Sequence, residues 1–166
     1  RNYQANPELW RRIGAFRYGE AEYVHPMSAR DANRISPGRD HWRNWLPATY
    51  YCTHALAPIM YITDTWPAKV NAFVVPYDFD DVELRGRTAR RSDMASAIMV
   101  RMQDGSIAKL LQVSLRGHGV WVRVHGNLGL METLRWGPHG TLRVRREPFD
   151  KAPGEPEELV YAPDFP

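Results

Sequence analysis

Alternating hydrophobic and polar positions run through most of the second half of the chain. Between residues 69 and 146, apart from the polar segment 76–93, short apolar stretches follow one another with only brief turns between them, such as Asp104-Gly105 and the segment 126–129. Alternation with a period of two is typical of strands, and turns this short leave no room for a crossover helix. The pattern therefore predicts one antiparallel sheet over residues 69–146, a meander in which consecutive strands pair. These side chains are expected to be buried: Val70, Val74, Ile98, Val100, Leu111, Val113, Val122 and Val124.

The first half of the chain carries the helical signals. Asn6-Pro7-Glu8 is typical of a helix start, and Gly14 is expected to end the short helix that follows. A strand is expected from Phe16 to Val24, where the pattern changes to alternation. Apolar side chains near one face then predict a second helix over residues 49–65. Pro58 interrupts this helix, because its ring nitrogen cannot donate to the carbonyl four residues earlier.

Two polar segments, residues 26–47 and 76–93, show little periodicity and are expected to be irregular loops. The tail from Lys151 holds one expected strand, at residues 159–161. Together these features predict an α+β fold in which N-terminal helices pack on a large, mostly antiparallel β-sheet. We expect a single domain over residues 1–166, preceded by a segment that is not part of this sequence because the chain begins with Arg rather than Met.

Composition narrows the class of protein. With 43% hydrophobic and 25% charged residues, the chain is typical of globular domains, and no apolar run is long enough to cross a membrane. No signal peptide opens the sequence, so a cytoplasmic location is favoured, although the segment before Arg1 is unseen. The lone Cys52 excludes an internal disulfide and a cysteine-based zinc site. Positive charge gathers in residues 85–91 and 143–146, but no nucleic-acid-binding signature accompanies it, so a solvated face is favoured and no nucleic-acid partner is expected.

The segment from His41 to Pro58, HWRNWLPATYYCTHALAP, is the richest in chemically useful side chains. Aromatic faces stack on the apolar face of a sugar, and arginine and histidine can bond its hydroxyl groups. Tyr51 and His54 stand three residues apart on the predicted helix, so their polar ends can converge on one ligand. The alternative is a purely structural role, in which His54 bonds a neighbour and these aromatic residues belong to the core: Trp42, Trp45, Tyr50 and Tyr51.

A second cluster lies at the end of the first predicted strand. Tyr23 and His25 share one strand face and precede a long polar segment, so they could rim a pocket. The alternative, favoured equally by the sequence, is a half-exposed strand without a binding role. The six histidines are scattered, and no pair has helical metal-ligand spacing, so no metal site is expected. The chain also lacks the glycine-rich motifs that hold nucleotide phosphates.

Three segments, in this order, resemble one known family. NPELWRRIGAFRYGEAEYVHP resembles the junction between the nucleotide-binding and substrate domains of the glucose–fructose oxidoreductase, inositol dehydrogenase and rhizopine-catabolism (Gfo/Idh/MocA) family. YYCTHALAP is similar to the family helix that carries a substrate-site histidine, and VRVHGNLGLMETL to a strand, Gly-x-x-Gly, strand segment. The resemblance implies the C-terminal substrate-binding and oligomerisation domain of an enzyme of sugar metabolism. Its NAD(P) would be bound mainly by a preceding Rossmann domain, and none is expected to bind this chain alone.

The resemblance also assigns roles to the candidate residues. It implies His54, Tyr23 and Tyr51 as catalytic, with His54 handling a proton. We expect His25, Trp42 and Arg43 to contact a carbohydrate substrate, and the resemblance implies a homo-oligomer formed through the sheet face.

One departure from the family pattern leaves the reaction open. Dehydrogenases of the family place an aspartate four residues before the histidine, whereas this chain has Tyr50 there. Tyr51-x-Thr53-His54 is instead similar to the NAD-dependent glycosidases, which include α-N-acetylgalactosaminidases. An NAD-dependent glycoside hydrolase is therefore the first alternative, and a non-catalytic carbohydrate-binding or scaffold domain is the second.

Overall fold

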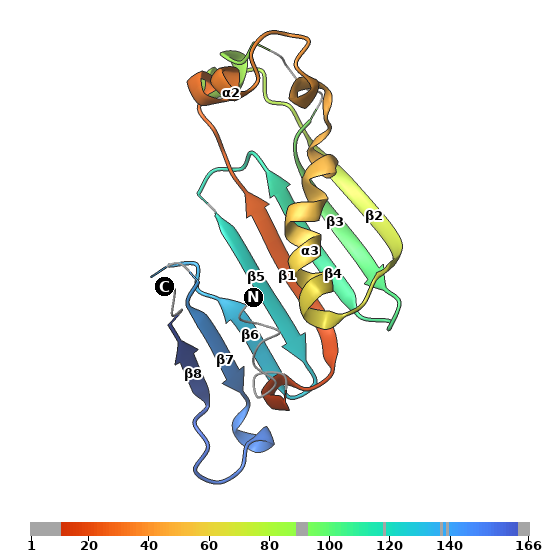
Figure 1. The fold of residues 1–166 in the computed structure, drawn as a ribbon, viewed down its shortest axis with the longest axis vertical. Helices are drawn as coiled ribbons and strands as arrows, with labels where there is room; N and C mark the ends of the chain where they lie inside the picture. The colour runs from red at the N-terminus through yellow and green to blue at the C-terminus, as the bar shows by residue number, and fades with distance from the viewer. Residues whose placement is uncertain (1–10, 89–92, 118, 137, 139, 163–166) are drawn as a thin grey trace.

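The structure, a computed structural model, describes residues 11–88, 93–117, 119–136, 138 and 140–162. An eight-stranded sheet occupies most of this part of the chain, and the helices lie against it or beyond one end of it (Figure 1). The strands are β1 (Phe16–Val24), β2 (Pro67–Pro76), β3 (Asp93–Met102), β4 (Ile107–Val113), β5 (Val120–Gly126), β6 (Gly129–Thr133), β7 (Leu142–Arg146) and β8 (Glu158–Tyr161). The helices are α2 (Ala29–Ile35), α3 (Cys52–Thr63) and α4 (Val82–Arg85), with short 3₁₀ turns η1 (Trp42–Trp45), η2 (Ala48–Tyr51) and η3 (Pro148–Asp150).

The strand order is β2-β3-β4-β1-β5-β6-β7-β8, which confirms the predicted large, mostly antiparallel sheet but corrects its connectivity. β4 and β5 do not pair with each other as the expected meander required. β1 lies between them, parallel to β4 and antiparallel to β5. Two strands on either side of a third are only about 10 Å apart, so the short link 114–119 can cross the end of β1. A short link therefore did not imply a pair of neighbouring strands.

The helix expected over residues 49–65 is confirmed as η2 followed by α3, with Pro58 inside α3. α3 packs on β1, β4 and β5 at the centre of the sheet and buries Ala55, Ile59 and Ile62 (Figure 1). Gly19 of β1 permits this close approach, because a Cβ atom there would lie 3.2 Å from the Cδ1 atom of Ile59. The hydrophobic core therefore lies between α3 and the central strands.

Five of the eight side chains expected to be buried are buried: Ile98, Val100, Val113, Val122 and Val124. The prediction is wrong for Val70 and Val74, which are more than half exposed, because β2 is an edge strand that α3 does not cover. It is also wrong for Leu111, which is only half-buried, whereas Leu110 is completely buried. With a period of two, burial of Leu110 under α3 turns Leu111 to the other face.

The two segments expected to be irregular loops each contain a short helix, so that expectation is wrong in part. α2 begins at Ser28, whose side chain accepts a hydrogen bond from the Asp31 amide at 3.1 Å. α4 begins at Asp81, whose carboxylate accepts from the amide of Glu83 at 2.9 Å. These capped helices are too short for a visible hydrophobic period. The strand near the C-terminus is confirmed as β8. Most of the first predicted helix lies outside the described residues, and its described part, residues 11–13, is helical.

Candidate functional site

The candidate aromatic residues and histidines converge where β1 ends and α3 begins. The ring of Tyr23 lies 4.3 Å from that of His54, with 23° between their planes. The same tyrosine ring lies 6.4 Å from Tyr51 and 6.0 Å from His25, again nearly parallel. Tyr23 comes from β1, Tyr51 from the last position of η2 and His54 from the first turn of α3. Residues about thirty positions apart in sequence thus form one ring stack around Tyr23.

Local structure explains how α3 presents its part of the stack. Tyr51 and His54 stand three residues apart across the start of α3, which places their rings 5.9 Å apart on one side. Pro58 has no amide hydrogen, so the His54 carbonyl receives no helical hydrogen bond from it. His54 and His25 are exposed and Tyr23 is half-buried, so the polar edges of the stack can be reached by a ligand.

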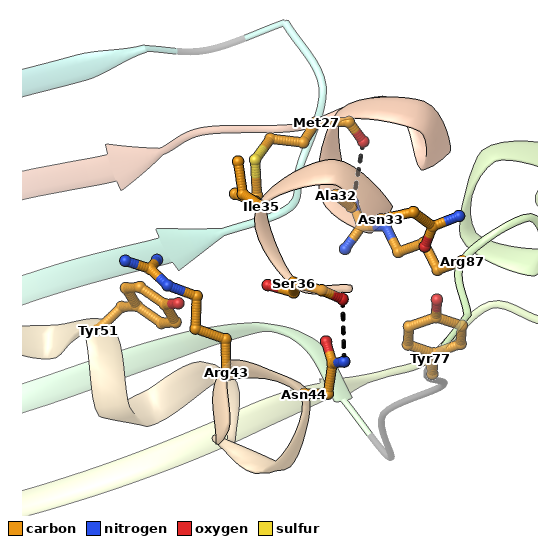
Figure 2. A pocket seen from close by; sticks show the side chains of 10 residues that line it. All are labelled: Met27, Ala32, Asn33, Ile35, Ser36, Arg43, Asn44, Tyr51, Tyr77 and Arg87. Atoms are coloured by element: carbon orange, nitrogen blue, oxygen red, sulfur yellow. Dashed lines mark hydrogen bonds between the residues drawn. The ribbon is translucent and has the colours of Figure 1, made fainter. Parts of the chain in front are cut away.

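A pocket adjoins this stack on the side of α2 and η1 (Figure 2). Arg43 and Tyr51 line it together, which connects it to the ring stack. The side-chain amide of Asn44 donates to the carbonyl of Ser36 at 3.3 Å and holds η1 against the end of α2. The full lining consists of Met27, Ala32, Asn33, Ile35, Ser36, Arg43, Asn44, Tyr51, Tyr77 and Arg87.

Trp42 is placed differently from the other candidate residues. It is exposed, and its ring contacts in the described structure are with the His41 ring at 5.8 Å and the Arg43 guanidinium at 4.9 Å. The structure therefore brings Arg43 to the pocket and Tyr23, Tyr51, His54 and His25 to the stack. It places Trp42 beside Arg43 rather than in the stack.

One buried polar residue at the candidate site was not predicted from the sequence. Gln112 of β4 is the register partner of Tyr23 on the adjacent strand, and it is completely buried. Its position two residues after Leu110 was the available signal, because the period of a strand puts both side chains on the same face.

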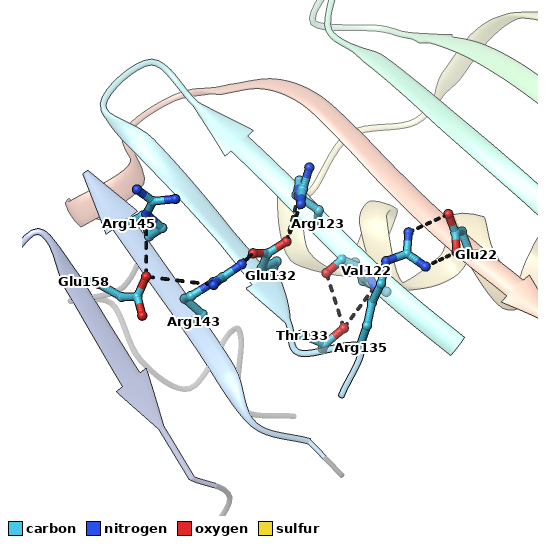
Figure 3. Close-up of polar contacts among 9 residues, drawn as sticks. All are labelled: Glu22, Val122, Arg123, Glu132, Thr133, Arg135, Arg143, Arg145 and Glu158. Carbon is cyan, nitrogen blue, oxygen red and sulfur yellow. Dashed lines mark hydrogen bonds and ion pairs between the residues drawn. The ribbon is translucent and has the colours of Figure 1, made fainter. Parts of the chain in front are cut away.

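The sheet face opposite α3, which we call the open face, carries a charged network over its C-terminal strands (Figure 3). Glu132 is 2% exposed, and Arg123 donates to it from Nε at 2.8 Å while Arg143 donates from Nε at 2.9 Å. Burial by itself raises the pKa of the Glu132 carboxyl, but the hydrogen bonds from Arg143 and Arg123 outweigh burial and lower the pKa below its usual value. Arg135 likewise binds Glu22 through two hydrogen bonds of 2.6 and 2.8 Å. The expected solvated basic run thus includes an arginine, Arg143, that is paired with a carboxylate.

The other half of the open face carries large apolar side chains among polar ones such as Asn71 and Lys109. Phe73 of β2 is 79% exposed and Met99 of β3 is 43% exposed. Both belong to residue rows that face away from α3, since the row of Ile98, Leu110 and Ala21 faces it. Large exposed apolar side chains that share one face often mark an interaction surface.

The described residues do not fit a dinucleotide. Pyrophosphate binding needs a glycine-rich turn at a helix N-terminus. The described α-helices begin at Ser28, Tyr51 and Asp81, and no glycine lies in the turn before any of them. Within the same residues, no group of three or more His, Cys, Asp or Glu side chains is placed to hold a metal ion. Nor does any helix there have the length and apolar character needed to span a membrane.

The ring stack presents both polar groups and ring faces to a ligand. Phenol and imidazole groups donate to and accept from hydroxyl groups, and their ring faces pack against the C–H face of a sugar. A neutral imidazole can also accept a proton from a hydroxyl group.

No protein-family model matches the sequence, and no curated protein matches it. Solved structures match it by fold. The first is UDP-N-acetylglucosamine 3-dehydrogenase from Acidithiobacillus ferrooxidans, with a TM-score of 0.52 and 18% identity over 92% of this chain and 41% of that one. The second is aldose-aldose oxidoreductase from Caulobacter crescentus, with a TM-score of 0.60 and 16% identity. That match covers 93% of this chain and 41% of the oxidoreductase. A levoglucosan dehydrogenase in complex with NADH and levoglucosan matches with a TM-score of 0.61 and 15% identity. That match covers 90% of this chain and 40% of the dehydrogenase.

The chain spans about two fifths of the length of these proteins. At these identities the similarity establishes the fold. The order of the strands and the helix α3 on one face of the sheet belong to the matched part, which covers nine tenths or more of this chain. The chain therefore has the fold of the C-terminal domain of Gfo/Idh/MocA-type oxidoreductases, the family that its sequence resembles.

Proposed function

We propose that the chain is the substrate-binding domain of an NAD(P)-dependent oxidoreductase that acts on a sugar or sugar derivative. The observation that carries this proposal is the stack of Tyr23 on His54, whose exposed side lies where β1 ends and α3 begins. The matched structures add support, since their names describe enzymes that act on UDP-N-acetylglucosamine, aldoses and levoglucosan.

In this proposal the chain handles the substrate and its proton. Tyr23, Tyr51 and His25 bond the hydroxyl groups of the sugar, and Arg43 reaches the substrate from the adjoining pocket. The unprotonated ring nitrogen of His54 accepts the hydroxyl proton as the carbon that bears the hydroxyl is oxidised. A nicotinamide nucleotide is the hydride acceptor, and because the described residues do not fit it, we assign its binding to polypeptide outside them.

The test is a screen of the full-length protein for sugar-dependent reduction of NAD or NADP, followed by two matched variants. Tyr51→Phe removes a hydroxyl group from the stack and should raise KM for the sugar. Tyr50→Phe is the control, because Tyr50 is exposed and its ring contacts that of Tyr51 rather than that of Tyr23. Equal kinetics for wild type and Tyr51→Phe would contradict the proposed site.

An NAD-dependent glycosidase is the second candidate, and the observation that favours it is Tyr50 at the position four residues before His54. Such an enzyme returns its cofactor to the starting state, so it would release nitrophenol from aryl glycosides without net reduction of NAD. Net NAD reduction that matches the sugar consumed would exclude the glycosidase. Sugar binding without either reaction would instead identify a non-catalytic binding domain.

In our proposal, the exposed apolar side chains of β2 and β3 on the open face pack against a second copy of the chain. A side chain as large and as exposed as Phe73 is costly to leave in water, and Met99 extends the same surface on the next strand. We therefore expect a homo-oligomer that pairs through this face.

A further inference from the structure

Buried polar atoms without a partner gather at one place in the described structure. Both polar atoms of the Gln112 carboxamide lack a hydrogen bond, as does the hydroxyl group of Ser96. Both side chains are completely buried. One carboxylate oxygen of Asp93 is also unpartnered, while its other oxygen accepts from the amide of Ala48, at the start of η2, at 2.9 Å.

These residues lie beneath the candidate site. Ser96, Gln112 and Tyr23 are register partners across three adjacent strands, β3, β4 and β1, and so share one face. The next row on this face is fully apolar, with Ile98, Leu110 and Ala21 packed under α3. The polar row therefore interrupts the apolar core at the one level where it meets the ring stack through Tyr23.

The backbone next to Gln112 is strained as well. Val113 has φ of 75°, in the left-handed region that a β-branched residue rarely adopts. Its carbonyl accepts from the amide of His25 at 2.8 Å, so the strained residue supports the end of β1. Unpaired buried amides and left-handed valines both lower stability, and such costs concentrate at functional sites.

We propose that Gln112 is a positioning residue of the carbohydrate site. When sugar is bound, its carboxamide hydrogen-bonds the hydroxyl group of Tyr23 on the adjacent strand and holds that ring against His54. This inference rests on the proposed function, because it supposes that the ring stack binds sugar. It accounts for the presence of a carboxamide where a leucine or methionine would pack without unpaired atoms.

The test compares Gln112→Met with Ser96→Ala. Both substitutions remove unpartnered buried atoms with little change of shape, but only Gln112 is adjacent to Tyr23. We expect both variants to unfold at a higher temperature than wild type. Only Gln112→Met should bind sugar more weakly, by about tenfold, which corresponds to the loss of one hydrogen bond.

The probes are levoglucosan, L-sorbose and UDP-N-acetylglucosamine, titrated separately into the protein while NMR follows the imidazole protons of His54. In wild type, binding should shift these protons through the ring current of Tyr23, and in Gln112→Met the shift should be smaller even at saturation. A Gln112→Met variant that binds and shifts like wild type would overturn the inference while leaving the proposed function intact. A variant that unfolds at a lower temperature would also overturn it, because the amide would then have a structural partner. If wild type binds none of the probes, the proposed function fails and this inference fails with it.

Discussion

Replacement of His54 by asparagine separates a catalytic histidine from a structural one. His54 is exposed, and its ring contacts are with Tyr23 at 4.3 Å and Tyr51 at 5.9 Å. Asparagine keeps a polar side chain at the start of α3 but cannot accept a proton near neutral pH. If His54 is the proton acceptor, turnover by the full-length protein should fall by roughly 10²–10⁴-fold, the usual contribution of one general acid–base group.

The structure also limits the effect of this change on stability. A stacked pair of rings contributes about 0.5–1.5 kcal/mol beyond the area it buries, and exposure of His54 puts the expected loss at the lower end. For a domain of this size, a loss of about 1 kcal/mol lowers Tm by roughly 2–4 °C. The melting temperature of His54→Asn should therefore stay close to that of wild type.

The assay measures initial rates of nicotinamide reduction and thermal unfolding by circular dichroism on the same preparations. His25→Asn is the matched control, since His25 is an exposed histidine at the edge of the same stack, 6.0 Å from Tyr23. It should raise KM for the sugar and leave kcat nearly unchanged. The reasoning would be refuted if His54→Asn kept the wild-type turnover, and a loss of several degrees in Tm would then assign His54 a structural role.

Four further outcomes are expected. Glu132→Gln should cost about 3 kcal/mol at neutral pH in urea unfolding, because it leaves two partly exposed arginines without their buried carboxylate. Since the pKa of Glu132 is lowered on folding, its contribution should be lost as the pH falls through that lowered pKa, so wild type but not Glu132→Gln should show this acid-dependent loss. Phe73→Asp should shift the protein from oligomer to monomer in sedimentation, whereas an unchanged mass would place the interface elsewhere. Gly126→Ala should lower Tm strongly, because the added Cβ would collide with the carbonyl oxygen of Ile13; an unchanged Tm would show that the backbone can shift. Calorimetric titration of NAD into the 166-residue chain should give no tight binding, and micromolar affinity would contradict the assignment of the nucleotide to other polypeptide.

The extents of most strands could be predicted because they depend on local pattern. β1 was expected from Phe16 to Val24 and has those bounds, and the Asp104-Gly105 turn joins β3 to β4 as expected. Period-two alternation and turn residues act over a few neighbouring positions, so they are visible without knowledge of the rest of the chain. The short helix α2 also left a local signal, the Ser28-x-x-Asp31 cap, which the absence of a period concealed.

The place of each strand in the sheet was not visible in this way. β1 pairs with β4 and β5, which lie about a hundred residues further along the chain, and no pattern within β1 specifies those partners. The exposure of Val70 and Val74 has the same origin. Apolar and polar residues alternate around Val70 and Val74 just as they do in the buried strands. The position of α3 over the central strands determines which of these apolar side chains are covered.

The candidate site was likewise predictable from the sequence in part and determined by the tertiary structure in part. The sequence and its resemblance to a family named Tyr23, Tyr51 and His54, because residue types and helical spacing are properties of the chain itself. Only the tertiary structure decided that Tyr23 stacks on His54 and that the unpaired carboxamide of Gln112 lies on the strand beside it. The physical reason is that contact and burial arise between segments brought together by packing, and their energies depend on neighbours that are distant in sequence.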